Sequence, residues 1–322
     1  MQSCISYFVL SFTNAILVAK YNVLYQVMQN LPLVSIICLC YNHEQFVVES
    51  LNSVLNQNYE NIELIIADDC STDNSKQVIQ EWLKNHAGVT FVSNETNLGN
   101  TKTFNKVLQL AKGDYIIDLA TDDILLTDCV EKQINTFLNS EKKKLGIVYG
   151  NAEVISENNT HIRYYYELDE DKKTLIKPAT GDIYLAMLSQ SSMICSVSSM
   201  VKREVLDELN GYDENLAYED LDLWIRASRT YNFEFIDAVL IQKRELENSL
   251  GNQFFKKFNS RTKKINYSSY LVIRKAISLN KTKEENKALL KRLHYEMIKA
   301  YKTNDILLFF KYIPLELKLR FS

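Results

Sequence analysis

Two acidic clusters in this 322-residue chain have the residue types and spacing to do chemistry. Thr121-Asp122-Asp123 follows an apolar run, and Glu219-Asp220 precedes a segment with helical apolar spacing. Adjacent carboxylates repel each other, so they suit a bound cation or a transferred proton. An Asp pair at a strand end fits a divalent metal carrying phosphates, and an acid at a helix start fits a general base. A solvated turn and helix capping are the structural alternatives, and the residues alone leave both open.

Two further segments are weaker candidates. Asp68-Asp69 ends an apolar run and opens a turn rich in Ser, Thr and Asn, where Asp69 either caps the turn or accepts a hydrogen bond from a nucleotide. In the segment 97–102, Gly99 lets the backbone approach a ligand, and Lys102 could meet a phosphate. A plain helix start explains that segment equally simply.

The elements that must position these residues alternate in type. Apolar runs at 34–40, 62–67, 89–92 and 114–119 read as strands, and segments with helical spacing lie between them, at 44–55, 75–84 and 101–111. This alternation predicts an α/β fold with a mostly parallel sheet and helices on both faces. Such sheets bind ligands at the carboxyl ends of their strands, where Asp69, Asp122 and Asp123 are expected.

The second half of the chain is less regular. We expect a loop or hairpin over 157–177, helices over 182–188 and 201–209 around a strand at 193–200, and a helix over 219–229. From residue 254 onward the sequence is basic and helical. The predicted organisation is an N-terminal extension (1–30), a catalytic domain (31–250) and a helical C-terminal region (251–322).

Charge is distributed unevenly around a net value of −3. Residues 251–322 contain 17 Lys and Arg against 5 Asp and Glu, a net charge of +12, and residues 1–250 contain 20 against 35, a net charge of −15. A basic tail on an acidic body predicts peripheral contact with an anionic membrane and no nucleic-acid partner. Residues 1–30 fit an interfacial helix, a packed helix or an upstream start-site artefact, with Met28 as an alternative initiator. The six cysteines have no metal-ligand spacing, and Cys38 and Cys40 read as buried core residues.

Taken in order, these motifs closely resemble family 2 glycosyltransferases, which are inverting enzymes of the GT-A fold. The resemblance covers residues 33–249 and rests on an ordered series of matching segments: Val34-Ser35-Ile36-Ile37, Tyr41-Asn42, Leu51 to Gln57, Ala67 to Ser75, Asn97-Leu98-Gly99, Lys112 to Ile116, Thr121-Asp122-Asp123-Ile124, Leu209 to Asp213 and Glu219 to Arg226.

The resemblance implies a role for each matching position. Leu39, Cys40 and Tyr41 would line the nucleotide pocket, and Asp69 would contact the base, usually uracil. Asp122 and Asp123 match the DxD-type element that holds a divalent metal, Mn²⁺ or Mg²⁺, with Asp123 as the direct ligand. Asp220 matches the catalytic base, and Glu219 would orient the acceptor.

The implied activity is that of a metal-dependent hexosyltransferase. It would move a sugar from a nucleotide donor, expected to be a UDP-sugar, to a hydroxyl of a glycan or lipid-linked acceptor in polysaccharide biosynthesis. The expected location is the cytoplasm, at the inner face of the cell membrane. For this chemistry, Asp123 and Asp220 must face one crevice wide enough for a sugar.

Three positions depart from the family pattern. Ala120 stands where many relatives have a further Asp, Phe104 replaces a common Arg, and Leu246 occupies the position of a His that often helps to hold the metal or diphosphate. The departure at Leu246 keeps open a non-catalytic nucleotide-sugar-binding module. A nucleotidyltransferase is a third possibility, but the segment 41–44 lacks the Gly-rich, basic phosphate loop such an enzyme should have after its first strand.

Overall fold

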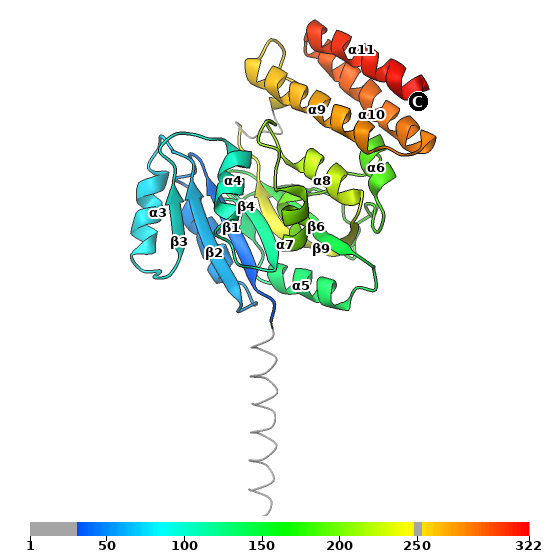
Figure 1. Ribbon diagram of the computed structural model, residues 1–322. Coiled ribbons are helices and arrows are strands. Elements are labelled where there is room, and N and C mark those ends of the chain that lie inside the picture. Colours follow the sequence, from blue (N-terminus) through cyan, green and yellow to red (C-terminus); the bar gives the residue numbers. More distant parts are fainter. Residues whose placement is uncertain (1–30, 248–252, 322) are drawn as a thin grey trace, which may run out of the picture.

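The computed structural model describes residues 31–247 and 253–321. The expected N-terminal extension, and the expected domain boundary near residue 250, lie outside the described residues. Within them, the sheet has nine strands in the order β3-β2-β1-β4-β8-β6-β9-β5, with β7 paired to β6 (Figure 1). The strands are β1 (Val34–Cys40), β2 (Ile62–Asp68), β3 (Thr90–Ser93), β4 (Tyr115–Ala120), β5 (Ile124–Leu125), β6 (Leu145–Ile155), β7 (His161–Tyr164), β8 (Met200–Lys202) and β9 (Asn232–Arg244).

The parallel half of the sheet sets the place of the acidic turns. β1 pairs in parallel with both β2 and β4, and the register places Leu39 beside Ala67 on one side and Ala120 on the other. Because these strands end level with one another, the turns that carry Asp69 and Asp122 leave the sheet at one edge. That edge is the carboxyl end, where open α/β sheets bind ligands.

The strands are apolar on both faces because helices cover both. Ile37, Leu39 and Ile65 point into one core, and Ile36, Cys38 and Ile66 point into the other. Continuous apolar runs of this kind are typical of strands buried on both sides. The covering helices in the first 250 residues are α2 (Val47–Leu55), α3 (Ser75–Leu83), α4 (Asn100–Leu108), α5 (Cys129–Asn139), α6 (Tyr184–Ser189), α7 (Arg203–Leu209) and α8 (Asp220–Ser228).

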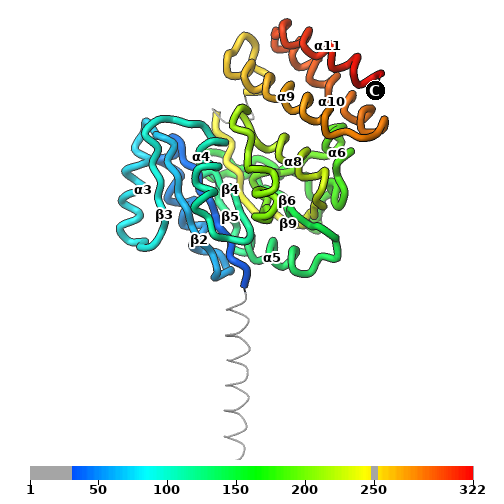
Figure 2. The backbone as a smooth tube through the Cα atoms, viewed as in Figure 1, coloured from blue at the N-terminus to red at the C-terminus, as the bar shows by residue number. Residues whose placement is uncertain are grey.

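The C-terminal region is helical, as predicted from its sequence. It consists of α9 (Ser260–Leu279), α10 (Lys283–Lys302) and α11 (Ile306–Phe321), which lie together beside α6 and α8 (Figures 1 and 2). α10 begins with a capping box in which the Thr282 hydroxyl accepts from the Glu285 N–H, and Glu285 accepts from the Thr282 N–H. No helix among the described residues is both long enough and apolar enough to span a bilayer.

Polar contacts fix α9 against the segment that leads into α8. The Ala217 N–H donates to the Ser268 hydroxyl at 2.8 Å, and the hydroxyls of Tyr218 and Ser269 lie 2.7 Å apart. About two turns further along α9, Lys275 pairs with Asp222 at 2.8 Å. These contacts tie the C-terminal helices to the residues around Glu219 and Asp220.

One sequence-based element is wrong. The expected strand over 193–200 is instead irregular, with a 3-10 turn at Ser196–Ser198, and the strand β8 begins only at Met200. A turn is formed there because the Ser198 hydroxyl donates to the carbonyl oxygens of Cys195 and Gly150, which ladder bonds would otherwise use. The expected hairpin within 157–177 is present as β7, which pairs with β6.

Candidate active site

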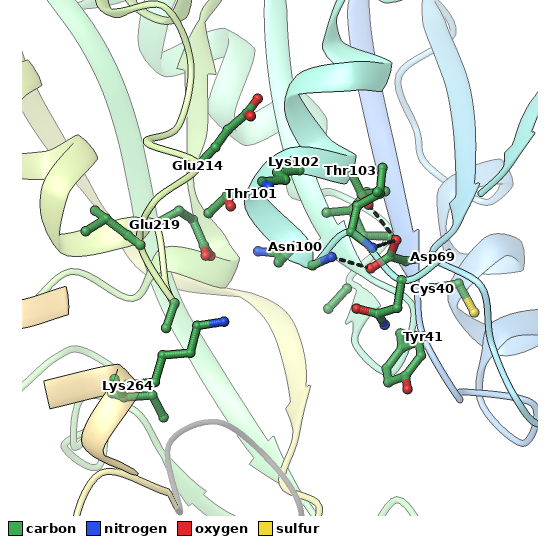
Figure 3. Close-up of a pocket in the computed structure, with 18 of the residues that line it drawn as sticks. Cys40, Tyr41, Asp69, Asn100, Thr101, Lys102, Thr103, Glu214, Glu219 and Lys264 are labelled. Atoms are coloured by element: carbon green, nitrogen blue, oxygen red, sulfur yellow. Dashed lines mark hydrogen bonds between the residues drawn. The ribbon is translucent and has the colours of Figure 1, made fainter. Parts of the chain in front are cut away.

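A cavity of 580 Å³ lies at the carboxyl edge of the parallel strands (Figure 3). One wall is formed by residues at the ends of β1 and β2, including Tyr41 and Asp69, and by the loop before α4 with its first turn, which carries Lys102. The facing wall carries Glu219 and Lys264, which come from the segment before α8 and from α9. Strand ends, a helix start and the C-terminal region therefore meet around one space.

Asp69 holds the loop that forms one wall of this cavity. Its carboxylate accepts hydrogen bonds from the backbone N–H groups of Leu98 at 2.9 Å and Gly99 at 2.8 Å, from the Thr103 hydroxyl at 2.8 Å and from the Asn94 amide at 2.9 Å. Gly99 has a φ of +86°, which a residue without a side chain adopts at little cost. Three of the four bonds go to Oδ1, so Oδ2, bonded only to Gly99, retains acceptor capacity for a ligand.

Thr121, Asp122 and Asp123 form a buried turn directly after β4. The Asp123 carboxylate accepts from the Arg244 backbone N–H at 2.8 Å, and the Arg244 guanidinium donates to the Asp122 carbonyl at 3.0 Å. His43 approaches from the turn after β1, with Nδ1 3.0 Å from the Thr121 hydroxyl and 3.8 Å from the Asp122 carboxylate. The ends of β1, β4 and β9 thus meet at this turn.

The donor set of this turn fits a hard divalent cation. Burial raises the pKa of Asp123 well above its ordinary value, and the adjacent charge of Asp122 raises it further. Two carboxylates that destabilise each other's charge in this way favour a cation between or beside them. The described residues contain no cluster of three His, Cys, Asp or Glu side chains able to enclose a metal. The expected set is thus one or two carboxylates completed by substrate phosphates, which is how Mg²⁺ is commonly held.

Glu219 and Asp220 occupy the start of α8. Asp220 accepts from the Ser196 hydroxyl at 3.0 Å and from the Leu221 N–H at 2.7 Å. Burial raises the pKa of Glu219 to about 8, with further contributions from the charges of Asp220 and Asp118, while a hydrogen bond from Asn100 lowers it. The Glu219 carboxyl therefore holds its proton more readily than an exposed glutamate does.

The turn Cys195-Ser196 lies near both acidic clusters. Ser196 binds Asp220, as described above. Burial raises the pKa of Cys195 to about 11, and the charge of Asp123 adds to this increase. Asp220 therefore contacts this turn directly through Ser196, and Asp123 acts on the neighbouring Cys195 through its charge.

The cavity brings together most, but not all, of the residues expected from the sequence. Leu39, Cys40, Tyr41, Asp69, Lys102 and Glu219 line it. Asp122, Asp123 and Asp220 are not among its lining residues, although Asp122 contacts His43 and Asp220 adjoins Glu219, both of which are. The sequence reading missed the lining residues His43, Glu214, Arg261 and Lys264. His43 and Glu214 lie beside recognised motifs, which is a usable signal, whereas nothing in the sequence marks Arg261 or Lys264.

Phe104 and Asn105 connect the two walls of the cavity. The Phe104 ring packs against Tyr212 with ring centroids 4.3 Å apart, and the Asn105 amide exchanges two hydrogen bonds of 2.9 Å with the Tyr212 backbone. Gly211 has a φ of +67°, and a Cβ there would meet the Asn105 Oδ1 at 2.4 Å. The close approach of α4 to the segment before α8 thus requires glycine at position 211.

The family assignment follows from comparison with known proteins. The model of the family described as "Glycosyl transferase family 2" matches residues 35–209, more than half of the chain. This chain belongs to glycosyl transferase family 2. An uncharacterised glycosyltransferase of Haemophilus influenzae is 30% identical over 304 residues, covering 88% of this chain and 92% of that protein. The family transfers sugars from nucleotide-activated donors, so the chain is a nucleotide-sugar-dependent glycosyltransferase.

Solved structures share the GT-A fold of this glycosyltransferase. Staphylococcus aureus TarS 1–349 in complex with UDP-GlcNAc is 14% identical, with a TM-score of 0.65 over 89% of this chain and 81% of that one. The mannosyltransferase PcManGT from Pyrobaculum calidifontis, in complex with GDP-Man and Mn²⁺, is 17% identical, with a TM-score of 0.58 over 86% and 73% of the two chains. These identities bear on the fold alone.

Proposed function

We propose that this glycosyltransferase transfers a sugar from a nucleoside-diphosphate donor, expected to be UDP-linked, to a hydroxyl of a glycan or lipid-linked acceptor with inversion at the anomeric carbon. The observation that carries the proposal is the single cavity that has Asp69 on one wall and Glu219 on the other, with Lys102 among its lining residues. Both structural neighbours are complexes with a nucleotide sugar, UDP-GlcNAc in TarS and GDP-Man in PcManGT. Asp69 on one wall, and Glu219 with the adjoining Asp220 on the other, match the nucleobase end and the sugar end of such a donor.

In this proposal, each end of the cavity has one task. Asp69 accepts a hydrogen bond from the nucleobase through its Oδ2, and the Gly99 backbone allows the nucleotide to come close. Asp220 accepts the proton of the acceptor hydroxyl, which attacks the anomeric carbon on the face opposite the departing diphosphate. The Ser196 hydroxyl and the Leu221 N–H orient the Asp220 carboxylate. A single displacement of this kind inverts the anomeric configuration without a covalent sugar–enzyme intermediate.

We further propose that Asp122 and Asp123 hold a divalent metal, Mn²⁺ or Mg²⁺, with Asp123 as the direct ligand. When bound, such a cation stabilises the negative charge that develops on the leaving diphosphate. Arg244 keeps both residues in place, through the Asp122 carbonyl and the Asp123 carboxylate.

Release of nucleoside diphosphate from a panel of nucleotide sugars tests the proposed function. We expect wild-type protein with Mn²⁺ to release the diphosphate from at least one donor, and Asp220→Asn to lose most of this release while still binding the donor. Asp207→Asn, an exposed position on α7, is the matched control. A protein that binds donors but releases nothing is the non-catalytic module instead. Release of inorganic pyrophosphate from a nucleoside triphosphate would indicate the nucleotidyltransferase.

The C-terminal helix α11 supports peripheral contact with an anionic membrane. Leu307, Phe310, Leu317 and Phe321 recur at helical spacing along one side of α11, and each exposes more than half of its side-chain surface. The region that carries this apolar stripe has a net charge of +12, which is complementary to anionic lipid headgroups. We propose that the stripe lies in the headgroup region and brings the cavity to a lipid-linked acceptor.

Flotation with vesicles tests this contact. Wild-type protein should float with vesicles of phosphatidylglycerol and phosphatidylcholine but less with phosphatidylcholine alone. Leu307→Ser/Phe310→Ser should reduce flotation, and Ile176→Ser, which changes a residue that is 84% exposed elsewhere on the body, should not. Equal flotation of both variants would contradict the proposed contact.

A further inference from the structure

One face of helix α9 contacts the catalytic domain along its second half and reaches the cavity along its first half. Residues three or four positions apart lie on the same side of a helix, and the members of this series are Arg261, Lys264, Ser268, Val272 and Lys275. The second half of the series packs on the body, since Ser268 binds Ala217, Val272 is buried in the core and Lys275 pairs with Asp222. The first half, Arg261 and Lys264, reaches the cavity wall. Because the second half of α9 is fixed to the catalytic domain, Arg261 and Lys264 in its first half are held at the cavity wall.

The cations at the cavity wall have no ion-pair partner among the described residues. Arg261, Lys264 and Lys102 all line the cavity, and none of them forms an ion pair with a carboxylate of the described residues. Elsewhere on α9 and α10, Lys275 pairs with Asp222, and the buried Lys299 pairs with Glu296. Figure 3 shows the Lys264 amine directed into the space between the two walls.

The carboxylates that line the same cavity do not neutralise these cations. Asp69 accepts four hydrogen bonds on the opposite wall, and the spare acceptor capacity of its Oδ2 is assigned to the nucleobase. Glu214 accepts a hydrogen bond from Asn105 at 3.1 Å. Glu219 has a raised pKa because it is buried beside Asp220. The cavity is thus bordered by cations that have no ion-pair partner in the part of the chain that the structure describes, and an anionic ligand would supply one.

We propose that Arg261 and Lys264 of α9, together with Lys102 of α4, bind the diphosphate of the nucleotide donor. This inference rests on the proposed function, because it assigns the phosphates of the same ligand whose base contacts Asp69. Guanidinium and ammonium groups form charge-assisted hydrogen bonds to phosphate oxygens and stabilise charge on a departing diphosphate. The C-terminal region is on this account part of the donor site and not only a membrane anchor.

Binding calorimetry with three ligands tests the inference on the full chain. The ligands are UDP, uridine and inorganic pyrophosphate, and the variants are Arg261→Gln, Lys264→Gln and the double substitution. Lys263→Gln is the matched control, because Lys263 is an exposed cation on the same turn that does not line the cavity. All of these side chains are exposed, and a thermal melt of each variant checks that folding is retained.

We expect the double variant to bind UDP and pyrophosphate at least about tenfold more weakly than wild type, with uridine binding unchanged. Each single variant should lose roughly three- to tenfold, and Lys263→Gln should match wild type. Weakening of UDP binding by added salt should also be smaller in the double variant. Unchanged UDP and pyrophosphate affinities in the double variant would overturn the inference while leaving the proposed function intact.

The pyrophosphate arm separates failure of the inference from failure of the proposed function. A wild-type protein that binds neither UDP nor GDP, nor any sugar donor derived from them, would contradict the proposed function. If it nevertheless binds pyrophosphate, and binds it more weakly without Arg261 and Lys264, the assignment of these residues as phosphate ligands stands. Loss of pyrophosphate binding equally in Lys263→Gln would indicate a general charge effect and overturn the assignment.

Discussion

Replacement of Arg244 by Met is expected to be among the most damaging single changes at the site. The Arg244 side chain is 1% exposed, and its guanidinium donates to the carbonyl oxygens of Asp122, Ser156 and Glu157 and to the carboxylate of Glu49. Met fills a similar volume but donates nothing, so these acceptors lose their partner together. Breaking a buried, hydrogen-bonded charge of this kind costs about 3–5 kcal/mol.

Urea and thermal denaturation monitored by circular dichroism measure this loss. In a domain of this size, 1 kcal/mol corresponds to about 2–4 °C in Tm, so the expected decrease is roughly 6–20 °C. Arg163→Met is the matched control, because Arg163 is 55% exposed and forms one surface pair with Glu245. That control should cost less than about 1 kcal/mol. Equal losses in the two variants would refute the claim that Arg244 stabilises the Asp122–Asp123 turn through burial.

Three further predictions concern the cavity walls. Asp69→Asn should lower the free energy of unfolding by about 1.5–3 kcal/mol and weaken UDP binding at least about tenfold, because an amide cannot accept all four hydrogen bonds; calorimetry with UDP measures the second effect. Glu219→Gln should flatten the pH dependence of stability. Because the pKa of Glu219 is raised, the folded wild type retains a proton between about pH 4.5 and 8 that the unfolded chain loses, and its free energy of unfolding should fall as pH rises, by up to about 1.4 kcal/mol per pH unit. Urea titrations of both proteins at several pH values test this. Gly211→Ala should lower the free energy of unfolding by about 1–3 kcal/mol more than Gly88→Ala, as measured by denaturant unfolding. Both glycines have a positive φ, but only at Gly211 would the added Cβ meet another atom, the Asn105 Oδ1, at 2.4 Å.

The sequence was sufficient to predict the parallel half of the sheet. The run Val34–Cys40 is apolar at nearly every position because both faces of β1 are covered, and this pattern is visible without coordinates. The acidic turns after β2 and β4 follow directly from such runs, so their common edge could also be predicted. Asp69 was correctly placed at this edge, but its role as the clamp of the Leu98–Gly99 loop depends on partners about thirty residues away.

Elements of the second half were harder to predict because tertiary contacts determine them. β9 is the longest of the described strands, yet its residues from Glu234 to Val239 are only half-buried, and the short apolar run Ala238–Ile241 covers only a third of it. Arg244 lies at the end of β9, and its burial against residues more than eighty positions away has no local signal in the sequence. The same holds for Arg261 and Lys264, which resemble any other cations of the basic tail until α9 is docked on the segment before α8.

A structure of the protein bound to a non-hydrolysable nucleotide sugar tests the central claim most directly. The account predicts the nucleobase beside Asp69, the diphosphate beside Lys102, and the anomeric carbon of the sugar facing the Asp220 carboxylate. A nucleotide bound outside the cavity, or a sugar whose anomeric carbon faces away from Asp220, would contradict it.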